Sequence, residues 1–150
     1  MNRWLSLAGF LLVSLGGGLW IGSGNRPDDW YRHLDKPWFN PPDWVFAPAW
    51  TVLYVLIAVA GWRVWQSGNR KALPTWAVQM GLNFLWSPLF FTAHATLAAL
   101  VVVLGLFVSI LAFLAQTGDK RDKIAFWCFV PYAVWVGYAS LLNGAIWWLN

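Results

Sequence analysis

The sequence predicts an all-α integral membrane protein, a five-transmembrane-helix bundle with a long first extramembrane loop. Three observations lead to this fold class. Hydrophobic residues make up 59% of the 150 residues and charged residues only 11%, whereas a soluble domain carries about 25% charged residues. The chain has 14 tryptophans, and tryptophan concentrates at membrane–water interfaces. Several long stretches contain no charged residue at all. A soluble or disordered chain is therefore excluded.

Four stretches without Asp, Glu, Lys or Arg define the helices. A spanning helix needs about 20 residues, so three of the stretches hold one helix each. The stretch from Ala72 to Gly118 would run roughly 70 Å as one helix, more than twice the hydrocarbon thickness, so it must break. The polar segment Thr92–Thr96 near its middle is the expected break. We predict a single membrane domain, residues 1–150, with spans at approximately 4–22, 44–66, 74–92, 95–116 and 124–148.

Prolines mark two of the expected helix starts. Pro41 and Pro42 precede the second span and Pro74 precedes the third. Proline is favoured in a first turn because its missing N–H would be unpaired there. The first helix follows Arg3 and resembles a signal peptide, but no A-x-A-like cleavage site follows it. We therefore expect this helix to be retained, with a cleaved signal as the alternative.

The cations predict the orientation in the membrane. With five spans, the N-terminus and the loops after spans two and four share one side. That side carries seven cations, Arg3, Arg63, Arg70, Lys71, Lys120, Arg121 and Lys123. The other side carries three, Arg26, Arg32 and Lys36. Because cytoplasmic loops are enriched in Lys and Arg, we expect a cytoplasmic N-terminus and an external first loop and C-terminus.

The first loop, about Ser23 to Asp43, is much the longest connection. Loops of this length in compact bundles usually form lids or binding sites, although a passive linker is the alternative. Four aromatic residues argue against a passive role, because they need a surface to cover. They are Trp30, Tyr31, Trp38 and Phe39.

Polar and aromatic residues gather at one depth beneath this loop. Three spans carry such residues at helical spacing. The second span has Phe46, Trp50 and Tyr54, and the third has Gln79, Asn83, Ser87 and Phe90. The fifth has Trp135, Ala139 and Asn143. Small residues mark the first and fourth spans, namely Gly16–Gly18, Gly22, Ala95, Ala98 and Ala99. This combination predicts a cavity for a planar amphipathic molecule. Two alternatives stay open: the small residues could serve close helix packing or a dimer face, and Gln79 and Asn83 could join helices by hydrogen bonds.

The remaining tryptophans divide by depth. Those near span ends are interpreted as interface anchors; they are Trp4, Trp44, Trp62, Trp65, Trp76, Trp127, Trp147 and Trp148. Interface anchoring explains Trp50, Trp86 and Trp135 less well, because they lie deeper in their spans.

The sequence offers little catalytic apparatus. The histidines are His33 and His94, and the one cysteine, Cys128, excludes a multi-cysteine metal site. No Ser–His–Asp set, metal-ligand spacing or phosphate loop is visible, so we expect no metal. The cations are spread over several loops rather than gathered in a patch, so we expect no nucleic acid partner. No aspartate lies inside an apolar stretch, which makes a proton pump a poor candidate.

Several motifs are spread along the whole chain. They are Trp30–Tyr31, Leu34-x-Lys36–Pro37, Pro41–Pro42-x-Trp44–Val45–Phe46, Gln79-x-x-Leu82–Asn83-x-x-Trp86–Ser87–Pro88-x-Phe90–Phe91 and Val130–Pro131–Tyr132-x-x-Trp135. In this combination the chain resembles the translocator protein family (TspO/MBR, peripheral-type benzodiazepine receptor), as a bacterial-type member. The resemblance implies a five-helix membrane protein, often a homodimer, that binds porphyrins such as protoporphyrin IX and benzodiazepine-type ligands. No cofactor is required, because the porphyrin is the ligand or substrate.

The resemblance also assigns residues to the ligand site. They are Trp30, Tyr31, Trp50, Asn83, Ser87, Phe90, Trp135 and Ala139. It links Trp30 and Trp135 to porphyrin degradation, which would need light and oxygen. Three loop cations, Arg26, Arg32 and Lys36, are expected to meet the porphyrin carboxylates.

Porphyrin transport, sensing and light-dependent degradation are therefore the expected roles. The alternative is a transporter or regulatory partner for another hydrophobic ligand, such as a sterol or lipid, without chemistry. Animal members of the family carry a C-terminal cholesterol motif with a basic end. No Lys or Arg follows Lys123 here, which argues against specific sterol binding.

Overall fold

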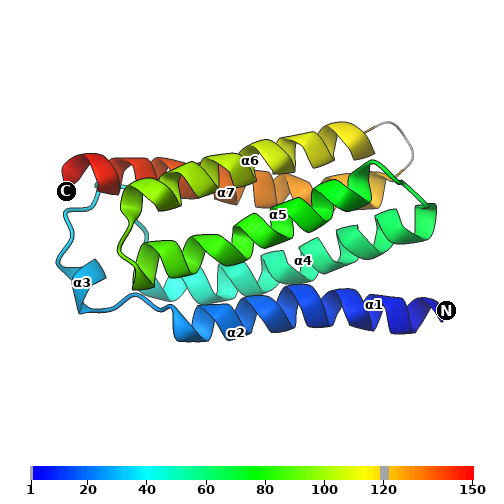
Figure 1. Cartoon of the computed structure of the whole chain (residues 1–150), viewed down its shortest axis with the longest axis horizontal. Helices are drawn as coiled ribbons and strands as arrows, with labels where there is room; N and C mark the ends of the chain where they lie inside the picture. The colour runs from blue at the N-terminus through cyan, green and yellow to red at the C-terminus, as the bar shows by residue number, and fades with distance from the viewer. Residues whose placement is uncertain (1, 119–121) are drawn as a thin grey trace.

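The computed structural model describes residues 2–118 and 122–150, and every regular element within them is helical. Five long helical segments run side by side (Figure 1). They are α1 (Arg3–Leu11) continuing through a π-helical turn (Leu12–Gly16) into α2 (Gly17–Gly24); α4 (Phe46–Ser67), preceded by a 3₁₀ turn (Asp43–Val45); α5 (Ala72–Ser87), continuing into a π-helical turn (Pro88–Thr92); α6 (Thr96–Thr117); and α7 (Lys123–Leu149). The short helix α3 (Asp29–Arg32) lies between α2 and α4. The start of α1 and the end of α7 lie at opposite ends of the bundle, with α3 at the α7 end (Figure 1).

The break in the stretch from Ala72 to Gly118 falls at residues 93–95. It lies inside the segment where the sequence predicts it. His94 has a φ of 54°, in the left-handed region, which is incompatible with a continuing right-handed helix. The α5 and α6 segments therefore pack against each other as antiparallel neighbours (Figure 1).

The predicted all-α class is confirmed, with four helices long and apolar enough to cross a membrane. They are Arg3–Gly24, Asp43–Ser67, Thr96–Thr117 and Lys123–Leu149. The α5 segment is not among them, because polar residues such as Gln79 and Asn83 lower its hydropathy. Both of these side chains are buried inside the bundle.

Polar caps and one glycine fix helix ends. The Asp28 carboxylate accepts a hydrogen bond from the Tyr31 backbone N–H at 3.1 Å, and Asp122 accepts one from Ala125 at 3.4 Å. Each cap satisfies a backbone donor that has no partner inside its helix. Helix α4 ends at Gly68, whose φ of 67° is a left-handed conformation that glycine adopts without strain.

The largest core cluster extends from the end of the bundle away from α3 to the middle of the bundle. Within it the rings of Phe113 and Phe129 stack with centroids 3.9 Å apart. Further buried members come from α4, α6 and α7, and include Ile57, Val64, Leu106, Ile110, Tyr132 and Val136. The half of the bundle nearest α3 is packed less completely, and it encloses a cavity.

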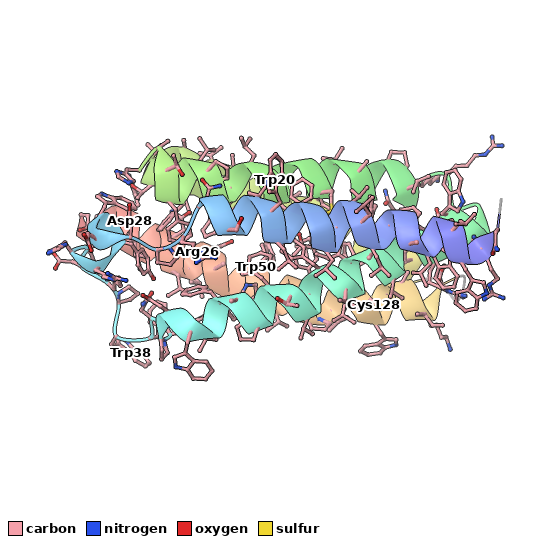
Figure 2. All side chains as sticks on the ribbon, turned by 90° about the horizontal axis from the view of Figure 1, so that it is seen from below. Trp20, Arg26, Asp28, Trp38, Trp50 and Cys128 are labelled. Carbon is pink, nitrogen blue, oxygen red and sulfur yellow. The ribbon has the colours of Figure 1, made fainter. Side chains whose placement is uncertain are left out.

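The outer surface of the bundle is apolar. Large exposed side chains include Leu12, Trp20, Val101, Val108, Val134 and Leu141, and Figure 2 shows Trp20 on the outside. In contrast, Gln79, Asn83 and Asn143 are buried. Polar residues inside and apolar residues outside are the arrangement expected of a bundle surrounded by lipid.

Two tryptophans near helix ends do not anchor an interface. Trp62 and Trp76 are buried, so the interpretation as interface anchors is wrong for them. The Trp62 indole donates to the Arg3 carbonyl, and the Trp76 indole donates to the Ile57 carbonyl at 2.9 Å. Trp76 fits because a Cβ at Gly61 would come within 2.6 Å of it. The other six proposed anchors are exposed: Trp4, Trp44, Trp65, Trp127, Trp147 and Trp148.

Candidate ligand-binding site

A cavity of about 560 Å³ lies in the half of the bundle nearest α3. Its walls come mainly from α2, α4 and α5, with α6 and α7 behind, and residues before and within α3 lie at its mouth. In Figure 2, Trp50 is seen between α2 and α4. The volume falls within the range typical of small-molecule sites, about 300–1,000 Å³.

Aromatic side chains form much of the cavity wall. Trp50 and Tyr54, on successive turns of α4, stack with ring centroids 5.4 Å apart and planes 28° apart. Trp86 and Phe91, from α5 and its π-helical turn, contribute two more rings, which meet edge to face at 5.8 Å. All four rings line the cavity. Flat aromatic faces are suited to stacking with a planar ligand.

A buried hydrogen-bond network fixes the polar part of the wall. The Tyr54 hydroxyl donates to Asn83 Oδ1 at 2.9 Å, and Asn83 Nδ2 donates to the Tyr132 hydroxyl at 2.7 Å. Tyr132 in turn donates to Gln79 Oε1 at 2.8 Å. Buried polar groups need such partners because the interior cannot replace water. Asn83 thus joins helices and lines the cavity, whereas Gln79 only joins helices.

A second network orients the Trp86 indole. Its Nε1 donates to Asn143 Oδ1 at 3.0 Å, and Asn143 Nδ2 donates to the Thr96 carbonyl at 2.9 Å. These bonds connect α5 to α7 and to the start of α6. The plane of the Trp86 ring at the cavity is therefore set by protein contacts rather than by a ligand.

Two glycines of α2 make room on the α2 side of the cavity. A Cβ at Gly18 would lie 2.4 Å from the Tyr54 ring, so only glycine allows this approach of α2 to α4. A Cβ at Gly22 would meet no atom within 4 Å. Both glycines line the cavity, where the sequence predicts small residues.

The fourth span contributes differently from expectation. Ala95, Ala98 and Ala99 do not line the main cavity, so the prediction of small residues there is wrong for this span. Val103 and Leu106, further along α6, line it instead. Ala99 is completely buried in a separate core cluster, which explains why it does not reach the cavity.

Charged residues stand at the cavity mouth. Arg26, Arg32 and Asp43 line this region. Arg32 pairs with Asp29 at 3.2 Å, with both side chains exposed, and such exposed pairs contribute little free energy. Arg32 can therefore exchange Asp29 for another anion at small cost.

Lys36, the third predicted cation, does not line the cavity. Its Nζ lies 4.6 Å above the centre of the Tyr31 ring and donates to the carbonyls of Arg32 and Leu34. Its role in the structure is to cover Tyr31.

A second cavity, of about 20 Å³, shares four lining residues with the first. Tyr31 and Phe90 line it, and Ala139 lines both cavities. The Tyr31 hydroxyl donates to Asn40 Oδ1 at 3.3 Å. Burial raises the pKa of Tyr31 above its ordinary value, although the Asn40 hydrogen bond opposes this. Tyr31 therefore presents a neutral hydroxyl at physiological pH.

Four of the eight predicted ligand residues line the main cavity: Trp50, Asn83, Ser87 and Ala139. Tyr31 and Phe90 line the small one. Trp30 and Trp135 line neither.

Trp30 and Trp135 line neither cavity but contact residues nearby. Trp30 stacks on His94 with ring centroids 4.0 Å apart and planes within 9°. Trp135 meets Trp50 and Phe46 edge to face at 6.3 and 6.1 Å, so it supports the cavity wall from behind. Its indole Nε1 is buried and has no hydrogen-bond partner in the described part of the chain.

Phe91 and Asp43 are among the cavity residues that sequence reasoning missed. In the sequence Asp43 marks the end of the first loop, and its place just before an aromatic helix face is a usable signal. Phe91 gives no signal, because regular helical spacing selects Phe90 and turns its neighbour away. The π-helical turn brings both rings inside, with exposed fractions of 2% and 9%.

The chemistry available at the site is stacking, hydrogen bonding and charge pairing. Within residues 2–118 and 122–150, no three His, Cys, Asp or Glu side chains are grouped so that they could hold a metal ion.

The bundle has an apolar outer surface and encloses a cavity with aromatic walls. These features define a class of protein, the helical membrane proteins with an internal cavity. The chain belongs to the TspO/MBR family, whose sequence profile matches residues 9–149. The predicted family membership is confirmed, and the chain is a membrane protein of this family.

Named relatives come from bacteria, archaea and animals. The chain is 41% identical over 147 residues to the tryptophan-rich sensory protein of Cereibacter sphaeroides, covering 95% of this chain and 90% of that protein. It is 39% identical over 124 residues to the tryptophan-rich protein TspO of Archaeoglobus fulgidus, covering 81% and 80%. It is 34% identical over 155 residues to the translocator protein of Sus scrofa, covering 96% and 89%.

Proposed function

We propose that the protein binds a tetrapyrrole, protoporphyrin IX, in its main cavity. The observation that carries this proposal is the cavity of about 560 Å³ with stacked aromatic rings along its wall. A metal-free porphyrin is a flat, mostly apolar ring with carboxylates on one edge. Such a ligand needs aromatic faces for its ring, a few hydrogen-bonding groups to orient it, and a wet end for its charges.

The cavity mouth supplies groups suited to the charged edge. Arg26 and Arg32 are exposed there, and arginine forms strong charge-assisted hydrogen bonds with carboxylates. Asn83 and Ser87 lie deeper, beside the aromatic wall. The ligand would therefore enter with its ring between Trp50 and Trp86 and leave its carboxylates near α3.

Titration with protoporphyrin IX tests the proposal directly. Trp50 and Trp86 line the cavity, so binding should quench tryptophan fluorescence and saturate at one ligand per chain. Free tryptophan measured at the same porphyrin concentrations corrects for light absorbed by the ligand. Quenching that grows linearly without saturation would contradict the proposal.

Light- and oxygen-dependent degradation of the bound porphyrin is the chemistry that we propose for this site. The excited porphyrin would act as its own photosensitiser and take an electron from Trp50, with Trp135 6.3 Å behind Trp50 as a further electron donor. Dioxygen would be the terminal oxidant: it would oxidise the porphyrin ring and supply the added oxygen atoms, and an electron would return to the tryptophan. Trp30 meets Phe90, which lines the small cavity, edge to face at 5.9 Å. Illuminating the complex with and without oxygen separates an enzyme from a binding protein that acts as a sensor. Flux across sealed vesicles tests porphyrin transport.

One observation favours an alternative, a hydrophobic ligand such as a sterol or lipid bound without chemistry. Leu19 lines the cavity and is also 49% exposed on the bundle surface. An apolar chain could therefore reach the cavity from the side through this part of α2. Co-purified lipid that protoporphyrin IX displaces stoichiometrically would support this alternative.

We also propose that all five helical segments cross a bacterial membrane, with the N-terminus cytoplasmic and the α3 loop and C-terminus external. The two ends of the bundle support this, because α1 starts at one and α7 ends at the other (Figure 1). Two of the seven cations counted for the cytoplasmic side, Lys120 and Arg121, lie outside the described residues. The polar residues of α5 face the interior, so they do not oppose a membrane location.

A homodimer is proposed through α5 or α6. Helix α5 exposes Ala77 and Gly81, one turn apart, and α6 exposes Ala98 and Gly105. A Cβ at Gly81 would meet no atom within 4 Å. Small residues one turn apart let two membrane helices approach closely.

A further inference from the structure

The loop between α2 and α4 is attached to the bundle by two different sets of contacts. Its second half is held by α7. The Tyr138 hydroxyl donates to the Phe39 carbonyl. The Asn150 side chain accepts from the Asp35 N–H at 3.1 Å and donates to the Asp35 carbonyl at 2.9 Å. None of these four residues lines the main cavity.

The first half of the loop is the part that borders the cavity. Asn25, Arg26 and Pro27 all line it. This half ends at Tyr31, which is buried against Phe90 and Phe91. Residues 25–30 therefore form a short segment over the cavity mouth, between the end of α2 and an anchored tyrosine.

Residues 25–30 are held by the turn that joins α5 to α6. The His94 ring lies flat on Trp30, with centroids 4.0 Å apart and planes within 9°. His94 Nε2 lies 3.8 Å from one oxygen of Asp28, whose other oxygen caps α3. Two residues before His94, the Thr92 hydroxyl donates to Asn25 Oδ1. The segment thus has side-chain contacts with one turn, and His94 makes two of them.

The backbone of His94 is unusual as well. Its φ of 54° is left-handed, which is uncommon for a residue other than glycine. Hydrogen bonds on both sides hold it there, from the Ala93 N–H to the Pro88 carbonyl and from the Ala95 N–H to the Leu89 carbonyl, each 2.9 Å. Strained residues of this kind are kept where the surrounding structure fixes them, and they cluster at functional sites.

We propose that His94 is a positioning residue that latches residues 25–30 over the cavity mouth, and that a proton on His94 strengthens the latch. The proposal rests on the proposed ligand site for its consequence, which is the rate at which ligand leaves. His94 touches the loop and not the cavity, so its effect would pass through the position of Arg26 and Pro27.

The charges around His94 set the direction of the pH effect. Asp28 faces it from the start of α3, and Arg26 is the nearest cation along that segment. Asp29 and Arg32 pair with each other, and the turn at residues 92–96 carries no other charged side chain. A proton would give His94 an ion pair with Asp28 and a cation–π contact with Trp30. Because the His94 and Asp28 side chains are 40% and 51% exposed, we expect an effect of about two- to fivefold.

Three variants separate the parts of this latch. His94→Phe keeps a flat ring for stacking but cannot take a proton. His94→Asn removes the ring and suits a left-handed backbone, because asparagine tolerates that conformation. His33→Asn is the matched control, since His33 is the other histidine and its ring hydrogen-bonds to the Asp29 carbonyl, within the α3 region.

Hydrogen–deuterium exchange of the peptide covering residues 25–32 reports the latch without any ligand. Measurements at about pH 5.5 and about pH 7.5 compare a condition that favours a proton on an imidazole with one that disfavours it. Comparing variants at the same pH cancels the chemical dependence of exchange on pH. We expect the ratio of His94→Phe to wild-type exchange to be about two- to fivefold larger at the lower pH than at the higher pH, because strain of phenylalanine on the left-handed backbone acts at both. His94→Asn should exchange faster at both, and His33→Asn should match wild type.

Protoporphyrin IX release into excess phosphatidylcholine vesicles, followed by fluorescence, should show the same ranking of variants. The latch is overturned if His94→Asn exchanges like wild type at both pH values, and its proton dependence is overturned if the ratio of His94→Phe to wild-type exchange is the same at both. If protoporphyrin IX does not bind at all, the proposed function fails while the exchange data still decide the latch.

Discussion

Gly18 of α2 lies against the ring of Tyr54 of α4 so closely that a Cβ on Gly18 would come within 2.4 Å of the ring carbons. Tyr54 also stacks on Trp50 and donates to Asn83. One contact between two helices therefore determines the position of three side chains in the cavity wall.

Gly18→Ala should destabilise the protein and weaken protoporphyrin IX binding. The added methyl group must push Tyr54 or α2 aside, and overpacking costs typically about 1–3 kcal/mol. Gly9→Ala is the matched control, because a Cβ at Gly9 would meet no atom within 4 Å, and alanine is the better helix former by about 1 kcal/mol. Thermal unfolding in detergent measures both. Equal unfolding temperatures for Gly18→Ala and Gly9→Ala would show that Tyr54 moves aside without a loss of stability.

Ala139→Phe should weaken protoporphyrin IX binding by about one to two orders of magnitude. Ala139 lines both cavities, so a large ring there occupies ligand space. An overpacking cost of about 1–3 kcal/mol corresponds to this loss, because about 1.4 kcal/mol is tenfold in affinity. Val134→Phe, on the exposed face of the same helix, should leave the affinity unchanged. Fluorescence quenching gives both values, and an unaltered affinity in folded Ala139→Phe would place the site elsewhere.

Trp135→Phe should separate binding from chemistry. A phenyl ring still packs against Trp50 and Phe46, so binding should fall only modestly. Light-driven loss of the porphyrin absorption band should fall strongly, because the indole that would donate the electron is gone. Trp127→Phe, at an exposed position on the same helix, is the control. If porphyrin loss continues at the wild-type rate, Trp135 has no part in the reaction.

Cysteine labelling in intact cells tests the orientation. In a Cys128→Ala background, Trp38→Cys should react with an impermeant reagent added outside, and Ser67→Cys should not. Trp38 is 95% exposed in the loop that carries α3, and Figure 2 shows it on the outside of the bundle. Ser67 ends α4 at the other end. The opposite labelling pattern would reverse the proposed topology.

Crosslinking in native membranes tests the homodimer. Either Gly81→Cys on the exposed face of α5 or Gly105→Cys on the exposed face of α6 should give covalent dimers, whereas Val134→Cys on α7 should not. Expression should be varied over a wide range, because random collisions rise with density and specific contacts do not. A chain that stays monomeric at every density would end the dimer proposal.

The helices could be predicted from sequence because membrane thickness limits the length of an apolar helix. The same regularity places Trp50, Asn83 and Ala139 at one depth, and all three line the cavity. Helical spacing is sufficient there, because α4, α5 and α7 are regular around these positions.

Contacts between helices could not be predicted in the same way. Trp76 is buried only because its neighbour on α4 is Gly61, which no local pattern in α5 reveals. The position of Trp30 on His94 depends on how a loop folds back over a turn 64 residues later in the chain. Val103 and Leu106 line the cavity because of how α6 packs against the other helices, and the sequence of α6 alone does not reveal that packing.

The π-helical turn at Pro88–Thr92 makes the outer end of α5 sensitive to chain length. A π-helical turn holds one residue more than an α-helical turn. Deleting a single residue there would restore the ordinary register and rotate the residues beyond the turn by about 100°. Phe90 and Phe91 would no longer both face inward, and the turn that carries His94 would leave Trp30. A one-residue deletion would thus change the cavity and the loop contact together, where a substitution would alter only one of them.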